Sequence, residues 1–150
     1  MENLKDINGI NIAGIGQLTD ILLCHLLEHC PKITSLACDG CYNITDNVFQ
    51  TIIDHCKQLS TLRFNHCPKL THTALHILGD SKLKLIQVSF ISCDIAYVPP
   101  NFLKLIADQN ATFNLKDNPI LNIDHKYLTC YDIASVKDNL TPDKKHANIR

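Results

Sequence analysis

Cysteine and histidine are the residue types of this chain whose spacing could support chemistry, and the sequence contains eight of each. Cys38 and Cys41 form a Cys-x-x-Cys pair, the spacing of redox motifs and of half a zinc site. Three other cysteines directly follow a histidine, as His29-Cys30, His55-Cys56 and His66-Cys67. Because thiolates and imidazoles are preferred ligands of Zn²⁺, a zinc- or redox-active protein built on these His-Cys pairs is one hypothesis.

A regular spacing favours a different interpretation of the cysteines. Cys41, Cys67 and Cys93 stand 26 residues apart, and the apolar residues between them repeat with the same step. The rows in register are Ile7, Ile33, Leu59 and Leu85; Ile10, Leu36, Leu62 and Val88; Ile12, Cys38, Phe64 and Phe90; Leu18, Ile44 and Leu70; Leu22, Val48 and Ala74; and Leu26, Ile52 and Leu78. Such a period indicates stacked repeats, each burying its apolar side against the next.

The repeat gives most cysteines a structural place. We expect Cys41, Cys67 and Cys93 in the turn after each strand, as buried, unbridged thiols that donate weakly to backbone carbonyls. Only Cys24 and Cys130 lack a place in the repeat. A zinc site would need a second pair of ligands at metal-ligand spacing, so neither a metal nor another cofactor is predicted.

Each repeat combines two hydrophobic periods. Residues 61–65 alternate apolar and polar side chains, which indicates a short strand with one buried face. Residues 45–53 place apolar side chains three and four apart, which indicates a helix. Thr19, Thr45 and Thr71 stand where a hydroxyl would cap the first turn. A strand and a helix in every repeat predict an arc with a parallel sheet on its concave side and helices on its convex side.

One segment resembles a known family. From Cys56 to Thr71 the chain reads Cys-x-x-Leu-x-x-Leu-x-Phe-x-x-Cys-x-x-Leu-Thr. This pattern resembles the cysteine-containing leucine-rich repeat, best known from F-box/leucine-rich-repeat substrate receptors of ubiquitin ligases. The resemblance implies an α/β leucine-rich-repeat solenoid, a right-handed β-α superhelix of about five repeats. Residues 113–120 are similar to the commoner asparagine type of repeat, with Asn118 in the place of Cys93.

The repeats predict one leucine-rich-repeat domain over residues 1–121, with boundaries near 4–29, 30–55, 56–81, 82–107 and 108–121. Residues 122–140 are predicted to form a capping segment, in which Tyr127, Leu128, Tyr131 and Ile133 give an amphipathic helix. Residues 141–150 are predicted to be a loose tail.

Several classes of function are disfavoured. A net charge of −1 argues against a general nucleic-acid or anionic-membrane binder. No apolar run reaches the ~18–20 residues of a membrane span; the longest, residues 21–27, reads as a helix face. The chain shows no catalytic motif, and His72 and His76 are expected on a solvent-facing helix surface, so no enzyme and no small-molecule substrate are predicted. Reduced thiols without a visible secretory signal predict a cytoplasmic, reducing compartment.

The remaining candidate site is the concave surface. Strand residues alternate in direction, so the neighbours of the buried rows face outward. One outward row is Asn11, Ala37, Arg63, Ser89 and Asn114, and the next is Ala13, Asp39, Asn65, Ile91 and Lys116. Arg63 is the only arginine outside the C-terminal tail and falls on the middle strand. It is either an interface hot spot or the internal partner of Asp39, and the sequence leaves both open.

The sequence therefore predicts a protein-protein interaction module without catalytic activity, in which the concave face binds another protein. The resemblance suggests two settings. One is an effector of an intracellular bacterium that acts on proteins of the host cytosol. The other is a target-recognition component of a ubiquitin-ligase system.

Overall fold

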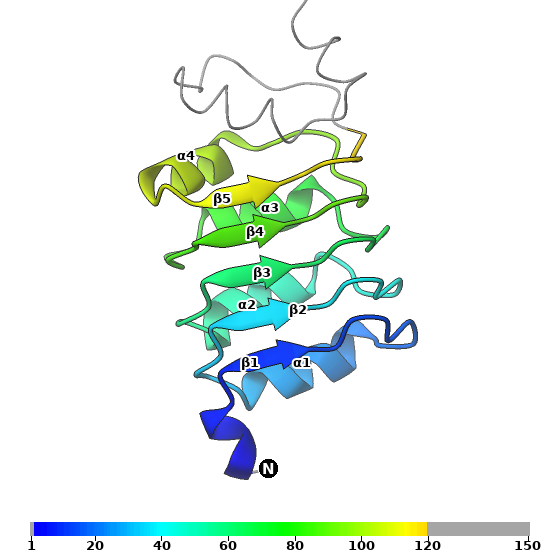
Figure 1. Cartoon of the computed structure of the whole chain (residues 1–150), viewed down its shortest axis with the longest axis vertical. Coiled ribbons are helices and arrows are strands. Elements are labelled where there is room, and N and C mark those ends of the chain that lie inside the picture. The colour runs from blue at the N-terminus through cyan, green and yellow to red at the C-terminus, as the bar shows by residue number, and fades with distance from the viewer. Residues whose placement is uncertain (1, 120–150) are drawn as a thin grey trace, which may run out of the picture.

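The computed structural model describes residues 2–119, and within them strands and helices alternate along the chain (Figure 1). A short 3₁₀ helix, η1 (Glu2–Asp6), precedes five strands: β1 (Gly9–Asn11), β2 (Ser35–Ala37), β3 (Thr61–Arg63), β4 (Gln87–Ser89) and β5 (Thr112–Asn114). The α-helices between them are α1 (Asp20–Glu28), α2 (Val48–His55), α3 (His72–Gly79) and α4 (Pro100–Asp108). The predicted α/β class is thus confirmed. The predicted capping segment 122–140 and tail 141–150 lie outside the described residues.

The five strands form one parallel sheet in the order β1-β2-β3-β4-β5. Ile10, Leu36, Leu62 and Val88 are register partners from strand to strand, so this predicted apolar row is confirmed. Figure 1 shows the helices stacked behind the sheet, and no other element of residues 2–119 covers its opposite face. We call this uncovered side the open face. Parallel strands with connecting helices on one side are compatible with the β-α repeats that the sequence predicts.

The core lies between the sheet and the helices. Leu36, Leu62 and Val88 point into it and are almost completely buried. The phenylalanines that follow two of these strands extend the core: the Phe64 ring centroid lies 6.0 Å from that of Phe90 and 5.1 Å from that of Phe49 on α2. Aromatic contacts of this kind stabilise a core beyond the area they bury. The strand and helix layers are therefore joined by one aromatic cluster.

Two of the three predicted threonine caps are confirmed. Thr19 Oγ1 accepts the Leu22 amide at the start of α1, and Thr71 Oγ1 accepts the Thr73 amide at the start of α3. The third prediction is wrong, because α2 begins at Val48 after the N-cap residue Asn47. Thr45 binds the Asp20 carboxylate of the preceding repeat through its amide and its hydroxyl, as Thr71 binds Asp46. Its Oγ1 accepts the Asn47 amide just before the helix begins.

Helix α1 differs from the predicted rows. Leu22 was expected to face the core, but it is 59% exposed, and Ile21 is 81% exposed. Leu23 and Leu27 are the fully buried residues of this helix. Val48 and Ala74, which occupy the same row in later repeats, are buried. Helix α1 belongs to the first repeat, and no α-helix precedes it in the described residues. Without that neighbour, only the face toward α2 and the sheet is buried.

This difference predicts unequal effects of two adjacent leucines on stability. Leu23→Ala should lower the free energy of unfolding by about 2–5 kcal/mol, because it leaves a cavity in a fully packed site. Leu22→Ala should change it by less than about 0.5 kcal/mol, since the side chain is mostly in solvent. Urea unfolding followed by circular dichroism measures both. Equal losses for the two variants would contradict the burial described for α1.

Candidate functional site

The open face contains a depression of about 330 Å³ between β1 and β4, which we call the trough. Over β1 and β2 its outward residues are Gly9, Asn11, Ser35 and Ala37, three of which are small. Over β3 and β4 they are Thr61, Arg63, Gln87 and Ser89. The complete lining is Gly9, Ile10, Asn11, Ser35, Leu36, Ala37, Thr61, Leu62, Arg63, Gln87 and Ser89.

Gly9 lies close to a side chain of the neighbouring strand. A Cβ atom at this position would lie 2.7 Å from the Ser35 hydroxyl oxygen and 4.0 Å from the Ser35 carbonyl oxygen. A larger residue would therefore turn the Ser35 hydroxyl away from its present position. The absence of a side chain at Gly9 keeps this end of the trough open.

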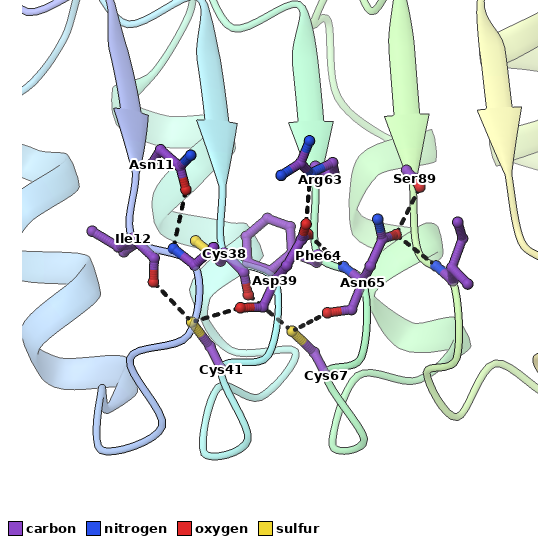
Figure 2. Close-up of polar contacts among 12 residues, drawn as sticks. Asn11, Ile12, Cys38, Asp39, Cys41, Arg63, Phe64, Asn65, Cys67 and Ser89 are labelled. Atoms are coloured by element: carbon purple, nitrogen blue, oxygen red, sulfur yellow. Dashed lines mark hydrogen bonds and ion pairs between the residues drawn. The ribbon is translucent and has the colours of Figure 1, made fainter.

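Arg63 stands at the centre of the open face, on the third of the five strands. It is the only ionisable residue within β1–β5. Its Nε lies 2.7 Å from Asp39 Oδ2, so the internal ion pair that the sequence left open is present. The Arg63 side chain nevertheless remains 47% exposed, against 22% for Asp39. In Figure 2 the far end of the guanidinium group points away from Asp39.

Polar side chains beside Arg63 join successive repeats through hydrogen bonds (Figure 2). Asp39 Oδ1 accepts the Asn65 amide at 3.0 Å. Asn65 Oδ1 in turn accepts the Ile91 amide at 2.8 Å and the Ser89 hydroxyl at 2.7 Å. Ser89 is only 7% exposed, so it has little surface to offer a partner. Asp39, Asn65 and Ser89 thus stabilise the stack of repeats and hold the strand that carries Arg63 in place.

The outer members of the predicted rows take no part in the hydrogen bonds that join Asp39, Asn65 and Ser89. Asn11 Oδ1 accepts the Ala13 amide at 3.1 Å, and Asn114 Oδ1 accepts the Lys116 amide at 3.0 Å. Lys116 is exposed after β5, and Ile91 is half-buried after β4. Of the two predicted rows, Asn11, Ala37, Arg63 and Ser89 line the trough.

Sequence reasoning missed one row of trough residues. Gly9, Ser35, Thr61 and Gln87 precede the Asn11 row by two positions and share its side of the sheet. The signal was present in the sequence, because strand residues two apart point to the same face. Extending the alternation by one step toward the N-terminus would have found them.

The repeated cysteines lie at the carboxyl ends of the strands, below the polar residues of Figure 2. The Cys67 thiol donates to the Cys38 carbonyl oxygen at 3.1 Å, and the Cys93 thiol donates to that of Phe64 at 3.0 Å. Cys41 is placed in the same way, 3.5 Å from the Ile12 oxygen. All three are buried and without a disulfide, which confirms the sequence prediction.

Asn118 takes the cysteine position in the last described repeat. Its Nδ2 donates to the Phe90 oxygen at 2.6 Å, the bond that corresponds to Cys93 with Phe64 one repeat earlier. Its Oδ1 also accepts the Ile95 amide at 3.0 Å. The predicted replacement of cysteine by asparagine is therefore confirmed.

The thiols should differ sharply in reactivity. Cys67 and Cys93 are buried, whereas Cys24 on α1 is half-buried. A maleimide added to native protein should therefore label Cys24 within minutes and leave Cys41, Cys67 and Cys93 unmodified until the protein unfolds. Peptide mapping by mass spectrometry measures the order. Labelling of Cys67 as fast as Cys24 would contradict its burial; Cys130 lies outside the described residues.

Burial of the thiols also predicts a loss of stability at high pH. Burial raises the pKa of Cys67 from 9.0 to about 11 and that of Cys93 to about 12. Above pH 9 the unfolded chain releases thiol protons that the folded chain keeps, so stability falls as the pH rises through these values. Each thiol can remove up to about 1.4 kcal/mol per pH unit. The free energy of unfolding should fall less steeply between pH 9 and 11 in Cys67→Ala than in the unaltered protein.

His72 and His76 are less exposed to solvent than the sequence predicted. The His72 ring lies 4.2 Å from the Tyr97 ring, between centroids, and His76 Nε2 is hydrogen-bonded to the Tyr97 hydroxyl at 2.8 Å. His72 Nδ1 is buried and has no hydrogen-bond partner. The two histidines therefore form a packed cluster with Tyr97. Nowhere in residues 2–119 do three or more histidine, cysteine, aspartate or glutamate side chains gather in an arrangement fit for a metal ion.

Comparisons with known proteins add no relative. No protein-family model matches the chain, and no curated protein matches it. No helix in the described part of the chain has the length and apolar character needed to cross a membrane.

Proposed function

We propose that this chain is a leucine-rich-repeat solenoid that binds another protein through the open face of its sheet. The observation that carries the proposal is the trough of about 330 Å³, with a half-exposed arginine on its wall. Hot spots in protein interfaces are enriched in arginine and lie near the centre of the contact. Residue 63 has both properties, since it is an arginine and stands on the middle strand of the sheet.

The dimensions of the open face suit a protein partner. Five strands about 4.8 Å apart span on the order of 20 Å, which matches an extended peptide or the edge of a small domain. The hydrogen bonds of Asp39 and Asn65 fix the loops at the carboxyl ends of the strands. A surface that is already rigid loses less conformational freedom on binding, which favours affinity.

The resemblance of residues 56–71 to cysteine-containing leucine-rich repeats supports two biological settings for this binding. In one, the chain is an effector of an intracellular bacterium that binds a host protein in the reducing cytosol. In the other, it recognises targets within a ubiquitin-ligase system. In both, the chain performs no chemistry of its own.

A pull-down with a matched pair of variants tests the proposal. Thr61→Trp fills the trough, while Thr73→Trp makes the same change at an exposed position on α3, in the helical layer. The unaltered protein and Thr73→Trp should capture the same cytosolic proteins, and Thr61→Trp should lose them. Quantitative mass spectrometry identifies those proteins and shows whether they include ubiquitin-ligase components. Equal capture by all three proteins would contradict binding at the open face.

A further inference from the structure

We propose that the trough receives an aspartate or glutamate side chain from an acidic segment of the partner protein, with Arg63 as its principal ligand. This inference rests on the proposed function and specifies the chemistry of the partner at the same site. It follows from the charges, the free space and the hydrogen-bond donors of the open face.

Arg63 is the more exposed member of its ion pair with Asp39. Arg63 is the only ionisable residue on the five strands, and its side chain is 47% exposed. The nearby carboxylate of Asp39 is less exposed, and both its oxygens are already engaged, Oδ1 by the Asn65 amide and Oδ2 by Arg63 Nε. A partner protein can therefore contact the Arg63 guanidinium group more readily than the Asp39 carboxylate.

The ion pair with Asp39 leaves Arg63 able to bind a second carboxylate. A guanidinium group has five N–H donors, and the contact with Asp39 is made by Nε, the nitrogen nearest the aliphatic chain. Figure 2 shows the far end of the group turned away from Asp39. Two parallel N–H donors match the two oxygens of a carboxylate, and this geometry makes the pair stronger than a single hydrogen bond. Asp39 also holds the arginine in position before the partner arrives.

The space next to Arg63 suits an inserted side chain. On the β1–β2 side of Arg63, the trough is lined by the small residues Gly9, Ser35 and Ala37 together with Asn11. Ser35 and Thr61 line the same space and carry hydroxyl groups that can donate to an anion. An inserted lysine or arginine would instead meet the like charge of Arg63. The lining therefore favours acidic over basic side chains.

A peptide library tests this chemistry directly. Phage displaying random 12-residue peptides are selected on immobilised unaltered protein, on Arg63→Glu and on Thr61→Trp, with Thr73→Trp as the matched control. The unaltered protein and Thr73→Trp should enrich peptides with an aspartate or glutamate at one fixed position. Arg63→Glu should enrich lysine or arginine there, and Thr61→Trp should bind none of these peptides. In a synthetic copy of an enriched peptide, changing the acidic residue to its amide should weaken binding about tenfold or more.

The outcomes separate this inference from the proposed function. Peptides that lose binding to Thr61→Trp but show no acidic preference would overturn the carboxylate inference and leave open-face binding intact. Peptides that bind Thr61→Trp and Thr73→Trp equally would contradict open-face binding itself. If the unaltered protein enriches no peptide, the carboxylate inference is overturned, and the pull-down remains the separate test of protein binding.

Discussion

Replacing Arg63 with alanine is expected to weaken partner binding by about thirtyfold, which corresponds to about 2 kcal/mol. The variant removes the only ionisable side chain on the strands, together with its own N–H donors beside the trough. Its side chain lies on the open face and not in the core, so the fold should remain intact. Isothermal titration calorimetry with a partner found by pull-down, or with an enriched peptide, measures the loss.

A control variant on the helical side and a conservative substitution of Arg63 make the result specific. Lys57→Ala removes a charge after α2, in the helical layer, and should leave the affinity unchanged. His76→Ala is a poorer control, because it would break the hydrogen bond with Tyr97. Arg63→Lys keeps the charge but loses the two parallel donors, so it should restore only part of the affinity. Loss of binding in Lys57→Ala together with full binding in Arg63→Ala would place the site on the helical side.

Replacing Asn118 with alanine is expected to lower the free energy of unfolding by about 3 kcal/mol. Asn118 is 3% exposed, and its side-chain amide both donates and accepts hydrogen bonds in the turn after β5. The substitution leaves the carbonyl groups of Phe90 and Leu115 and the amide of Ile95 without this partner in a buried site. Buried polar groups that lose a partner destabilise the folded state more than the bond itself contributes.

Asn118→Cys tests whether asparagine and cysteine are equivalent in the repeat. A thiol can donate to the Phe90 carbonyl, as Cys93 does to Phe64, but it is a poor acceptor for the Ile95 amide. The expected loss therefore lies between those of the alanine variant and the unaltered protein. Asn47→Ala is the matched control, because the Asn47 side chain makes no capping hydrogen bond, and it should change stability little. Chemical unfolding compares all four proteins; equal stability of Asn118→Ala and the unaltered chain would refute the structural role of Asn118.

Much of the fold could be predicted because the information is local or strictly periodic. Alternation around Leu62 identifies the buried face of β3, and the 26-residue step transfers this assignment to Leu36 and Val88. The same step placed Arg63 on the middle strand. Asn118 lies 25 residues after Cys93, one short of the step, and the resemblance to the asparagine type of repeat placed it in the cysteine position. These assignments needed no knowledge of distances, because in a parallel sheet of repeats the equivalent positions of successive repeats lie side by side.

The periodic pattern was misleading at the first repeat. Leu22 matches Val48 in the pattern, yet it is exposed, because burial depends on a neighbouring helix that α1 lacks on one side. The second repeat differs in another way. Thr45 and Thr71 make the same bonds to an aspartate of the preceding repeat, yet α2 begins three residues after Thr45 and α3 begins directly after Thr71. Equal spacing therefore gave Thr45 equal contacts but not an equal helix start.

By itself, the amino-acid sequence determined the repeat, the parallel register and the row of residues on each face of the sheet, because these depend only on period and alternation. The tertiary structure alone decided how the polar residues of the open face are used. Asp39 and Asn65 bond to groups in the next repeat, and Arg63 pairs with Asp39 while its far end stays exposed. Such contacts depend on distances of a few ångströms between segments about 24–26 residues apart, which no periodic pattern specifies. The trough arises for the same reason, since it needs small side chains on adjacent strands to lie together in space.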